Sequence, residues 1–333
     1  MGITLVTGAA GFIGSHISEA LVKSGRKVRG LVQTNSLNID FLRNTGAEVF
    51  YGDILDKNSV NSALEGVDTV FHLAANVRPS KWVYSRTGLL AEFNKVNFEG
   101  TKVLADAAKG RVKSFVFYSS IAAAGVGPML DETSTTMPET DYGMSKRNAE
   151  EYLTGLHKNE GFPVKMVRPG SVYGARNRNM GLLYRFFDFN FCPTIGTGNN
   201  TLPFTYVENL VKATLLIEEK GLAGEKYFVT EDPVSMRDFA NGSAAAMGKK
   251  LNGFYLPTGF MFGSLLFKEA IERLLFMRLF PMRMDVRLES VRIASGNWIC
   301  SNAKLKRLGY TPAVSFEESL VRTVKWYKDN GVV

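Results

Sequence analysis

The hydrophobic pattern of the first half of the chain switches repeatedly between two periods. Short apolar, β-branched runs are typical of buried strands, and segments with an apolar residue every three or four positions are typical of amphipathic helices. The runs predict strands within residues 2–7 and at 28–32, 48–51, 69–73, 114–118 and 164–167, separated by helices at 15–24, 38–45, 57–65, 90–109 and 142–158.

Strands that alternate with helices in this way form a parallel sheet covered by helices on both faces. Right-handed crossovers then give an α/β, doubly wound Rossmann sheet, whose ligand crevice lies at the carboxyl ends of the strands. After residue 174 the alternation ends, and helical periodicity returns at 206–219 and 236–247.

This change of pattern predicts two domains. We expect a Rossmann domain over residues 1–174, onto which 203–224 packs back. Residues 175–202 and 225–333 would form a smaller, mostly helical C-terminal substrate domain that contributes some elements to the sheet.

The segment from Phe254 to Met284 is unusually rich in Phe, Met and Leu. It is no membrane span, because proline, glycine and charged residues interrupt it: Pro257, Gly259, Gly263, Lys268, Glu269, Glu272 and Arg273. Three interpretations stay open: helices that pack on the smaller domain, an apolar lid over a substrate, and a weak membrane-surface contact favoured by Arg278, Arg283 and Arg287.

The net charge of +8 is concentrated in the second half of the chain. Residues 1–174 hold 19 basic and 17 acidic side chains, whereas residues 175–333 hold 21 and 15. The excess forms either a solvated basic face or the rim of a pocket for an anionic substrate. No basic run or nucleic-acid-binding module occurs, which argues against nucleic acid as a partner.

Cysteine and histidine usage argues against a metal centre. Cys192 and Cys300 lie far apart and match no disulfide framework or metal spacing, which indicates a reducing compartment and a cytoplasmic protein. We expect no signal peptide, because the first apolar run is a short strand without a basic leader. The three histidines, His16, His72 and His157, are scattered, so we interpret them as structural.

Three glycines follow the first predicted strand in the spacing Gly8-x-x-Gly11-x-x-Gly14, and a helical pattern comes next. A helix N-terminus offers unpaired N–H groups and the positive end of the helix dipole, and a pyrophosphate satisfies both. Gly8 permits a tight turn, Gly11 lets the backbone approach a phosphate, and Gly14 lets the helix pack on the strand. We therefore predict a dinucleotide-binding site.

The second candidate site is Tyr142-Gly143-Met144-Ser145-Lys146, at the start of a predicted helix. Positions i and i+4 share one helix face, with Cβ atoms about 5–6 Å apart. A phenol with a pKa of about 10 is a weak base at neutral pH, and an adjacent ammonium lowers that pKa by favouring the phenolate. Such a phenol can exchange a proton with a substrate hydroxyl or carbonyl. Ser119 and Ser120 end a predicted strand, where a hydroxyl can hydrogen-bond the reacting oxygen.

A series of motifs resembles, in order, the extended short-chain dehydrogenase/reductase superfamily. The motifs are Thr7-Gly8-Ala9-Ala10-Gly11-Phe12-Ile13-Gly14, Gly52-Asp53, His72-Leu73-Ala74-Ala75, Asn97-x-x-Gly100-Thr101, Ser119-Ser120, Tyr142-x-x-x-Lys146, Arg168-Pro169-Gly170-x-Val172-Tyr173-Gly174, Pro203-Phe204-Thr205-Tyr206-Val207-Glu208-Asn209 and Lys304-x-x-x-Leu308-Gly309-Tyr310-x-Pro312. The chain looks like the NAD-dependent epimerase/dehydratase branch, and its apolar segment 254–284 resembles 3β-hydroxysteroid dehydrogenase and dihydroflavonol reductase-like members. The likeness covers essentially the whole chain but does not specify the substrate.

The resemblance implies a role for each motif. Tyr142 would be the acid/base, Lys146 would lower its pKa and hold the nicotinamide ribose, and Ser120 would orient the substrate oxygen. The implied cofactor-binding residues are Gly8, Gly11, Phe12, Ile13, Gly14, Gln33, Asp53, Ile54, Ala74, Ala75, Tyr142, Lys146, Pro169, Gly170, Ser171 and Val172. Asn97 is interpreted as a structural helix residue. The helices near 90–109 and 142–158 resemble the pair through which relatives dimerise, so we expect a homodimer.

The end of the second strand departs from the NAD-binding pattern. In NAD sites an acid about 20 residues beyond the glycines bonds the ribose hydroxyls. Val32 stands here, followed by Gln33-Thr34-Asn35-Ser36, so no carboxylate would repel a 2′-phosphate and no arginine nearby in the sequence would bind one. We expect NADP, with NAD or dual use as the alternative.

Hydride transfer is common to the reactions that the resemblance implies. Related dehydratases carry an acidic pair after the strand-end serine or threonine, and Ile121-Ala122-Ala123 stand here, which disfavours dehydration. Our hypothesis is a dehydrogenase or reductase that acts on a secondary alcohol or ketone. The alternative is an NDP-sugar epimerase with retained NAD, for which the basic second half and the loop 173–178 are suited. A non-catalytic dinucleotide-binding regulatory protein is the third hypothesis.

Overall fold

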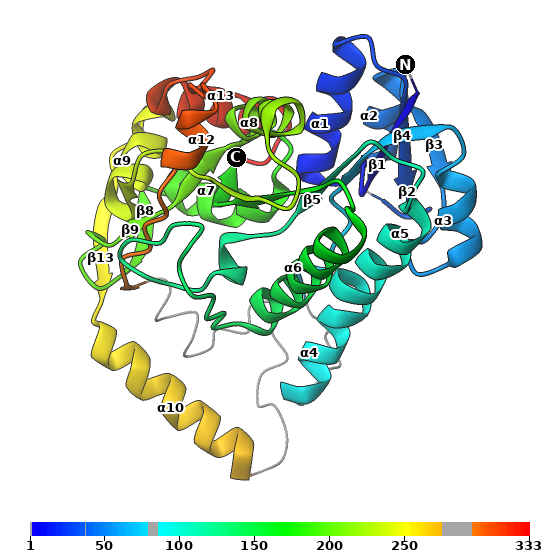
Figure 1. Ribbon diagram of the computed structural model, residues 1–333. Helices are drawn as coiled ribbons and strands as arrows, with labels where there is room; N and C mark the ends of the chain where they lie inside the picture. The colour runs from blue at the N-terminus through cyan, green and yellow to red at the C-terminus, as the bar shows by residue number, and fades with distance from the viewer. Residues whose placement is uncertain (1, 37, 79–85, 275–294) are drawn as a thin grey trace.

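A parallel sheet of seven strands lies at the centre of the computed structural model (Figure 1). The structure describes residues 2–36, 38–78, 86–274 and 295–333. The strand order is β11-β6-β5-β4-β1-β2-β3, and neighbouring strands pair in parallel. The strands are β1 (Ile3–Thr7), β2 (Val28–Val32), β3 (Glu48–Tyr51), β4 (Val67–His72), β5 (Ser114–Tyr118), β6 (Val164–Pro169) and β11 (Lys226–Val229). The predicted doubly wound sheet is confirmed.

Helices cover both faces of this sheet, because each carries one apolar stripe that must be buried. One face is covered by α1 (Phe12–Lys23), α2 (Ile39–Asn44) and α8 (Val207–Lys220). The other face is covered by α3 (Lys57–Ala63), α5 (Thr101–Ala108) and α6 (Asp141–Glu160). The helix α4 (Arg86–Asn94) continues through a π-helical turn, η1 (Lys95–Gly100), into α5, and η2 (Ile121–Ala123) is a single 3-10 turn after β5.

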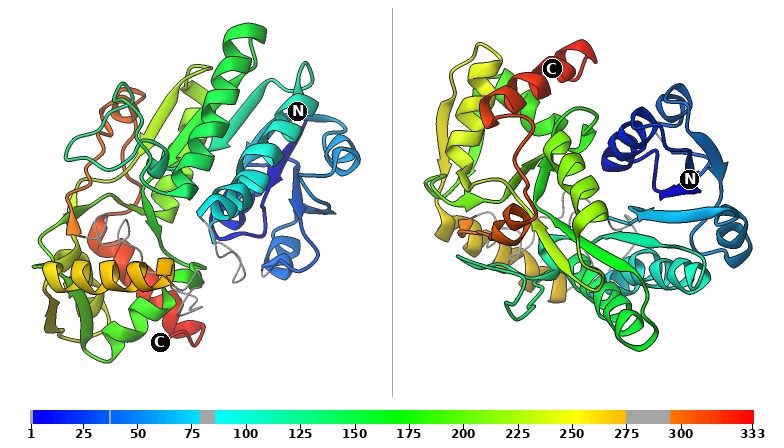
Figure 2. Two further views of the ribbon diagram at one scale, coloured as in Figure 1. Left: turned by 90° about the horizontal axis from the view of Figure 1, so that it is seen from below. Right: turned by 45° about the horizontal axis from the view of Figure 1, so that its top comes forward.

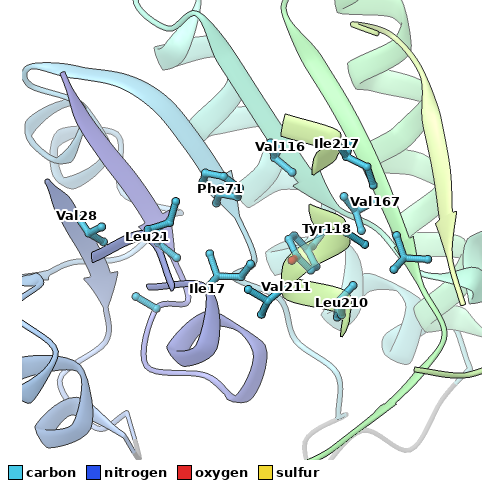
Figure 3. Packing of buried hydrophobic residues seen from close by; sticks show 14 of the residues in the cluster. Ile17, Leu21, Val28, Phe71, Val116, Tyr118, Val167, Leu210, Val211 and Ile217 are labelled. Carbon is cyan, nitrogen blue, oxygen red and sulfur yellow. The ribbon is translucent and has the colours of Figure 1, made fainter. Parts of the chain in front are cut away.

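The core beneath α1 and α8 holds the glycine turn against the sheet (Figure 3). Ile17 and Leu21 of α1 belong to the same buried cluster as Leu210 and Ile217 of α8. Over β5, the Tyr118 hydroxyl and Thr214 Oγ1 of α8 are 2.6 Å apart and share a hydrogen bond. Each large aliphatic side chain buried in this way stabilises the fold by about 1.5–3 kcal/mol. The position of α1 is therefore set by packing that reaches into the second half of the chain.

Two elements differ from the hydrophobic pattern for identifiable reasons. The first helix starts at Phe12 rather than at residue 15, because Gly11 already has the extended backbone of an N-cap. The long helix predicted at 90–109 is a composite of α4, η1 and α5. Its π-helical turn contains the buried Asn97, and such turns are frequent at functional sites.

The second half of the chain combines helices with short two-stranded sheets. Figure 2 shows its yellow to red elements on one side of the molecule and the blue to cyan elements on the other. An aromatic cluster forms its core, in which the Phe204 and Phe239 rings stack 4.0 Å apart. Its elements are β7 (Ser171–Tyr173), η3 (Arg178–Met180), α7 (Gly181–Asp188), β8 (Phe191–Ile195), β9 (Thr201–Leu202), β10 (Phe204–Tyr206), β12 (Val234–Ser235), α9 (Met236–Ala246), β13 (Asn252–Leu256), α10 (Thr258–Leu274), α12 (Ala303–Arg307) and α13 (Phe316–Asp329).

Besides α8, the second half of the chain contributes a strand to the central sheet. Strand β11 lies within the segment 225–333 and forms the edge of the seven-stranded sheet beside β6. The chain therefore contributes both a covering helix and an edge strand to the Rossmann sheet after residue 174.

The apolar segment 254–284 is described as far as residue 274. Its later part, which includes Arg278, Arg283 and Arg287, lies outside the described residues. In α10, Leu265 is buried, whereas Phe260, Leu266 and Phe267 are exposed. Part of the apolar face of α10 is thus open to solvent rather than packed on the second half. Within the described ranges, no helix has the length and apolar character needed to cross a bilayer.

A buried ion pair joins α6 to the sheet. Arg168 of β6 donates from Nε and Nη2 to Glu150 Oε1 and Oε2 at 2.8 and 2.6 Å, and both side chains are 1% exposed. Lys226 of β11 lies 3.4 Å from the same carboxylate and provides a second positive charge. Paired hydrogen bonds of this kind fix the direction of both side chains. The pair therefore holds α6, which carries Tyr142 and Lys146, in register with β6.

Candidate active site

The turn between β1 and α1 has a shape that only glycine allows. Gly8 has a φ of +67°, and a Cβ atom there would lie 2.9 Å from the backbone nitrogen of Ala74. A Cβ atom on Gly14 would lie 2.1 Å from the carbonyl oxygen of Gly8, which is far inside contact distance. The absence of side chains at these two positions lets α1 begin directly behind the strand.

The N-terminus of α1 fits a diphosphate. Gly11, at the N-cap, has no side chain to accept from the first-turn N–H groups, and the first turn contains no acidic residue. These N–H groups have no carbonyl partner within the helix and lie at the positive end of its dipole. A diphosphate would supply both the acceptors and the negative charge that this end lacks. The residues present therefore fit a dinucleotide cofactor.

A cleft of about 370 Å³ opens beside this turn. Eight of the predicted cofactor-binding residues line it: Gly8, Gly11, Phe12, Gln33, Asp53, Ile54, Ala74 and Ala75. Gln33 follows β2, Asp53 and Ile54 follow β3, and Ala74 and Ala75 follow β4, so the cleft lies at the carboxyl ends of the strands. The structure thus brings together residues that are up to 67 positions apart in the sequence.

Hydrogen bonds within the chain fix the positions of several polar groups in this cleft. Asp53 Oδ1 accepts from the Leu55 N–H at 2.9 Å, and Asp53 Oδ2 accepts from the Gln33 amide at 3.3 Å. The Ala74 N–H donates to Thr7 Oγ1 at 3.1 Å. Asp53 is therefore an acceptor shared between the ends of β2 and β3, and its position suits an adenine amino group.

The other eight predicted cofactor residues, Tyr142 and Lys146 among them, are not part of the lining of this cleft. Ile13 and Gly14 lie in the first turn of α1, and Pro169 is the last residue of β6. The Gly170 N–H donates to the Val229 carbonyl at 3.1 Å, and Ser171 and Val172 belong to β7, which pairs with β10. Since β6 and β5 are neighbours, Pro169 lies on the same edge of the sheet as the serines after β5.

Tyr142 and Ser120 meet at the carboxyl end of β5. Tyr142 lies in the first turn of α6, which Thr140 caps by accepting from the Gly143 N–H at 3.0 Å. The apolar surroundings of the phenol raise the pKa of Tyr142 to about 12, and a hydrogen bond with Ser120 opposes this shift. Ser120 Oγ also accepts from the Ala122 N–H at 3.1 Å. The phenol is therefore neutral near pH 7 and can act as a proton donor.

Lys146 lies one helical turn after Tyr142 and is buried. Its Nζ donates to the Tyr118 carbonyl at 2.7 Å and lies 5.0 Å from the centre of the Phe117 ring. Burial lowers the pKa of Lys146 to about 7, and the charge of Glu150 opposes this shift. In this ligand-free arrangement the ammonium faces β5, and it is not among the groups that shift the pKa of Tyr142. The lowering of the Tyr142 pKa that the sequence implied is therefore not seen here, because burial dominates.

A chain of buried hydrogen bonds connects the glycine turn to α6, which carries Tyr142 and Lys146. Thr7 Oγ1 and His72 Nδ1 are 2.7 Å apart, and His72 Nε2 and Thr101 Oγ1 are 2.9 Å apart. The Thr101 hydroxyl donates to the Asn97 carbonyl, so it accepts from Nε2–H of a neutral imidazole. Asn97 Nδ2 then donates to Ser145 Oγ on α6 at 2.9 Å. Asn97 therefore has the structural role that the sequence indicated.

The loop after β7 contributes residues that sequence reasoning placed elsewhere. Arg176, Asn177, Arg178 and Asn179 line the same cleft as Gly11 and Gln33. The sequence suggested this loop as a contact for a nucleotide-diphosphate substrate. No arginine follows β2 closely in the sequence. The fold adds Arg178, about 145 residues further along the chain than Gln33, to the lining of the cleft that Gln33 also lines.

Comparison with known proteins agrees with this geometry. Residues 4–230 match the model of the NAD dependent epimerase/dehydratase family. Sterol demethylase protein B of Methylococcus capsulatus is 29% identical over 99% of both chains, and a 3-beta-hydroxysteroid dehydrogenase of Mycolicibacterium neoaurum is 26% identical over 99% of this chain and 92% of its own. The crystal structure of UDP-glucose 4-epimerase from Thermotoga maritima with UDP-glucose is 25% identical, with a TM-score of 0.78 over 98% of this chain and 99% of that one.

The chain belongs to the NAD-dependent epimerase/dehydratase family and is an enzyme of the extended short-chain dehydrogenase/reductase type. The sequence-based prediction of this family is confirmed. Relatives within the family include dehydrogenases, epimerases and dehydratases.

The buried His72 makes folding stability depend on pH. Burial lowers the pKa of His72 to about 3, so between pH 3 and the unfolded value of about 6.5 the unfolded chain binds a proton that the folded chain does not. Stability is therefore lost as the pH falls, by about 2 kcal/mol from this residue between pH 7 and pH 5. We expect urea unfolding at the two pH values to show a smaller loss for His72→Gln than for the unmodified chain. Equal losses in both proteins would contradict the buried neutral imidazole.

Proposed function

We propose that this protein is an NAD(P)-dependent dehydrogenase or reductase that transfers hydride between the nicotinamide and a secondary alcohol or ketone of an apolar small molecule. The observation that carries the proposal is the neutral Tyr142 phenol, hydrogen-bonded to Ser120 at the carboxyl edge of the sheet, one strand away from the cofactor cleft. A bound nicotinamide cofactor supplies or accepts the hydride.

The protein residues would handle the proton. In the direction of reduction, Tyr142 Oη gives its proton to the carbonyl oxygen as the carbonyl carbon receives the hydride, and the product is the alcohol. Ser120 Oγ would donate a hydrogen bond to the same oxygen and hold it in place. With a pKa of about 7, Lys146 is partly protonated near neutral pH, and its ammonium form would stabilise the phenolate that remains.

The apolar substrate is supported by two observations. The sterol and hydroxysteroid relatives align over almost the whole chain. Phe260, Leu266 and Phe267 of α10 expose apolar surface in the second half, where the substrate domain was predicted. We infer a polycyclic or similarly hydrophobic alcohol or ketone as the substrate class.

An NDP-sugar epimerase is the second candidate, favoured by the likeness to UDP-glucose 4-epimerase. It would use the same Ser120, Tyr142 and Lys146, but it would keep its cofactor bound and return the hydride to the opposite face. Net consumption of added cofactor therefore separates the two candidates.

The tyrosine assignment predicts a selective loss of turnover. With a ketosteroid or hydroxysteroid substrate, Tyr142→Phe should lower kcat by about 100-fold or more, because the proton donor is removed. Tyr152→Phe is the matched control: Tyr152 lies on the same helix, and its hydroxyl donates to Asp106 at 2.5 Å, away from Ser120. Turnover by Tyr142→Phe at the rate of the unmodified enzyme would overturn the catalytic role of the phenol.

The cofactor proposal is NADP, used as a free co-substrate. The cleft carries neutral side chains at the end of β2, so a 2′-phosphate meets no carboxylate at the position where NAD sites place one. Steady-state assays should give NADPH a higher kcat/KM than NADH, with one NADPH oxidised per product formed. A higher value for NADH would reverse the preference, and turnover with no change in NADPH absorbance would favour the epimerase.

The proposal extends to a homodimer formed through the layer of α4, α5 and α6. In this layer Asn148 of α6 donates to Asn94 of α4 at 3.1 Å, and Tyr152 bonds Asp106 of α5, so the helices form one continuous surface. Light scattering at micromolar concentration should give twice the mass of one chain. A single-chain mass would contradict the dimer.

A further inference from the structure

Among the described residues, one arginine that lines the cleft has no partner for its side chain. This arginine, Arg178, belongs to the same lining as Gln33 and Ser36, which follow β2. Arg178 is exposed, and within the described ranges no carboxylate or carbonyl group pairs with its guanidinium. A free guanidinium beside neutral side chains offers a planar, permanently charged donor set for a phosphate.

The neighbouring arginine of the same loop is already engaged. Arg176 donates to Glu19 Oε2 at 2.5 Å and to His16 Nδ1 at 2.9 Å, and its guanidinium carbon lies 4.0 Å from the centre of the Phe41 ring. Arg176 therefore anchors the loop to α1 and α2, and its charge is compensated. Of the two arginines, Arg178 is the one whose charge is free to meet a ligand.

The backbone that carries Arg178 is held firmly although its side chain is free. The buried Asn177 donates from Nδ2 to the Val172 carbonyl at 2.9 Å and accepts from the Asn179 N–H at 3.0 Å. Its carbonyl accepts from the Tyr327 hydroxyl of α13 at 2.5 Å. Because the backbone is already fixed, ligand binding does not have to order the loop.

We propose that Arg178 binds the 2′-phosphate of NADP, with Ser36 as a neutral hydrogen-bond donor from the segment after β2. This inference rests on the proposed use of a nicotinamide cofactor. It assigns the choice between NADP and NAD to a residue from the loop after β7, so that the second half of the chain takes part in cofactor selection. Asp53, which also lines this cleft, accepts hydrogen bonds from Leu55 and Gln33, and we expect its carboxylate to face the adenine rather than the 2′-phosphate.

The test is calorimetric binding of NADP⁺, NAD⁺ and the fragment 2′,5′-ADP, with no substrate present. In Arg178→Ala the Kd for NADP⁺ and for 2′,5′-ADP should rise about tenfold, equivalent to about 1.4 kcal/mol, while the Kd for NAD⁺ changes less than twofold. Arg178→Glu should weaken NADP⁺ further, because a carboxylate repels the phosphate. Arg111→Ala is the matched control. This exposed arginine precedes β5 and therefore lies at the amino ends of the strands, whereas the cleft lies at their carboxyl ends.

The outcomes separate this inference from the proposed function. If Arg178→Ala weakens NADP⁺ and NAD⁺ equally, or changes neither, Arg178 does not bind the 2′-phosphate, although the enzyme still uses a nicotinamide cofactor. If the unmodified protein binds neither cofactor, the proposed function itself fails. Because the Arg178 guanidinium has no partner among the described residues, its variants should keep the thermal midpoint of the unmodified protein, and that measurement accompanies each titration.

Discussion

The arrangement of the site depends on the buried hydrogen bonds that run from Thr7 through His72, Thr101 and Asn97 to Ser145. An unpaired polar group in this environment costs about 1–3 kcal/mol, so each member holds its neighbour in one orientation. The first member ends β1 beside the glycine turn, and the last lies between Tyr142 and Lys146 on α6. The glycine turn and α6 are thus linked through side chains rather than through backbone alone.

The second constraint is electrostatic and involves Lys146 and Glu150, which lie four residues apart on α6. Arg168 and Lys226 both lie beside the buried Glu150 carboxylate, and the buried Lys146 donates from Nζ to the Tyr118 carbonyl. Because burial lowers the pKa of Lys146 to about 7, a small change in its surroundings alters its charge near neutral pH. A bound ligand with negative charge would favour the ammonium, and in that form the lysine would stabilise the Tyr142 phenolate. The unliganded fold keeps the proton on Tyr142.

The local parts of this site could be predicted from the sequence. Strands at 28–32, 48–51 and 114–118 have the bounds that their sequences indicated, because each run is too short for a helix and is rich in β-branched or aromatic residues. The contacts that cross the molecule could not be predicted. Arg178 lines the same cleft as Gln33, on a loop that Asn177 bonds to β7 and to α13, and the hydrophobic pattern does not predict such hydrogen bonds. The direction of the Lys146 side chain, toward β5, likewise depends on packing that spacing alone does not fix.

The cofactor cleft is therefore a joint product of both halves of the chain. Part of its lining follows the carboxyl ends of β1, β2, β3 and β4, as in other doubly wound sheets. The loop after β7 adds two arginines to this lining. That loop is bonded to α13 through Tyr327, and the core of α13 is shared with α9 and the aromatic cluster around Phe239. A ligand that moves α13 would act on the loop that carries Arg178, which Arg176 anchors to α1 at the same time. Cofactor and substrate binding would then be coupled through the position of one loop, without any change in the sheet.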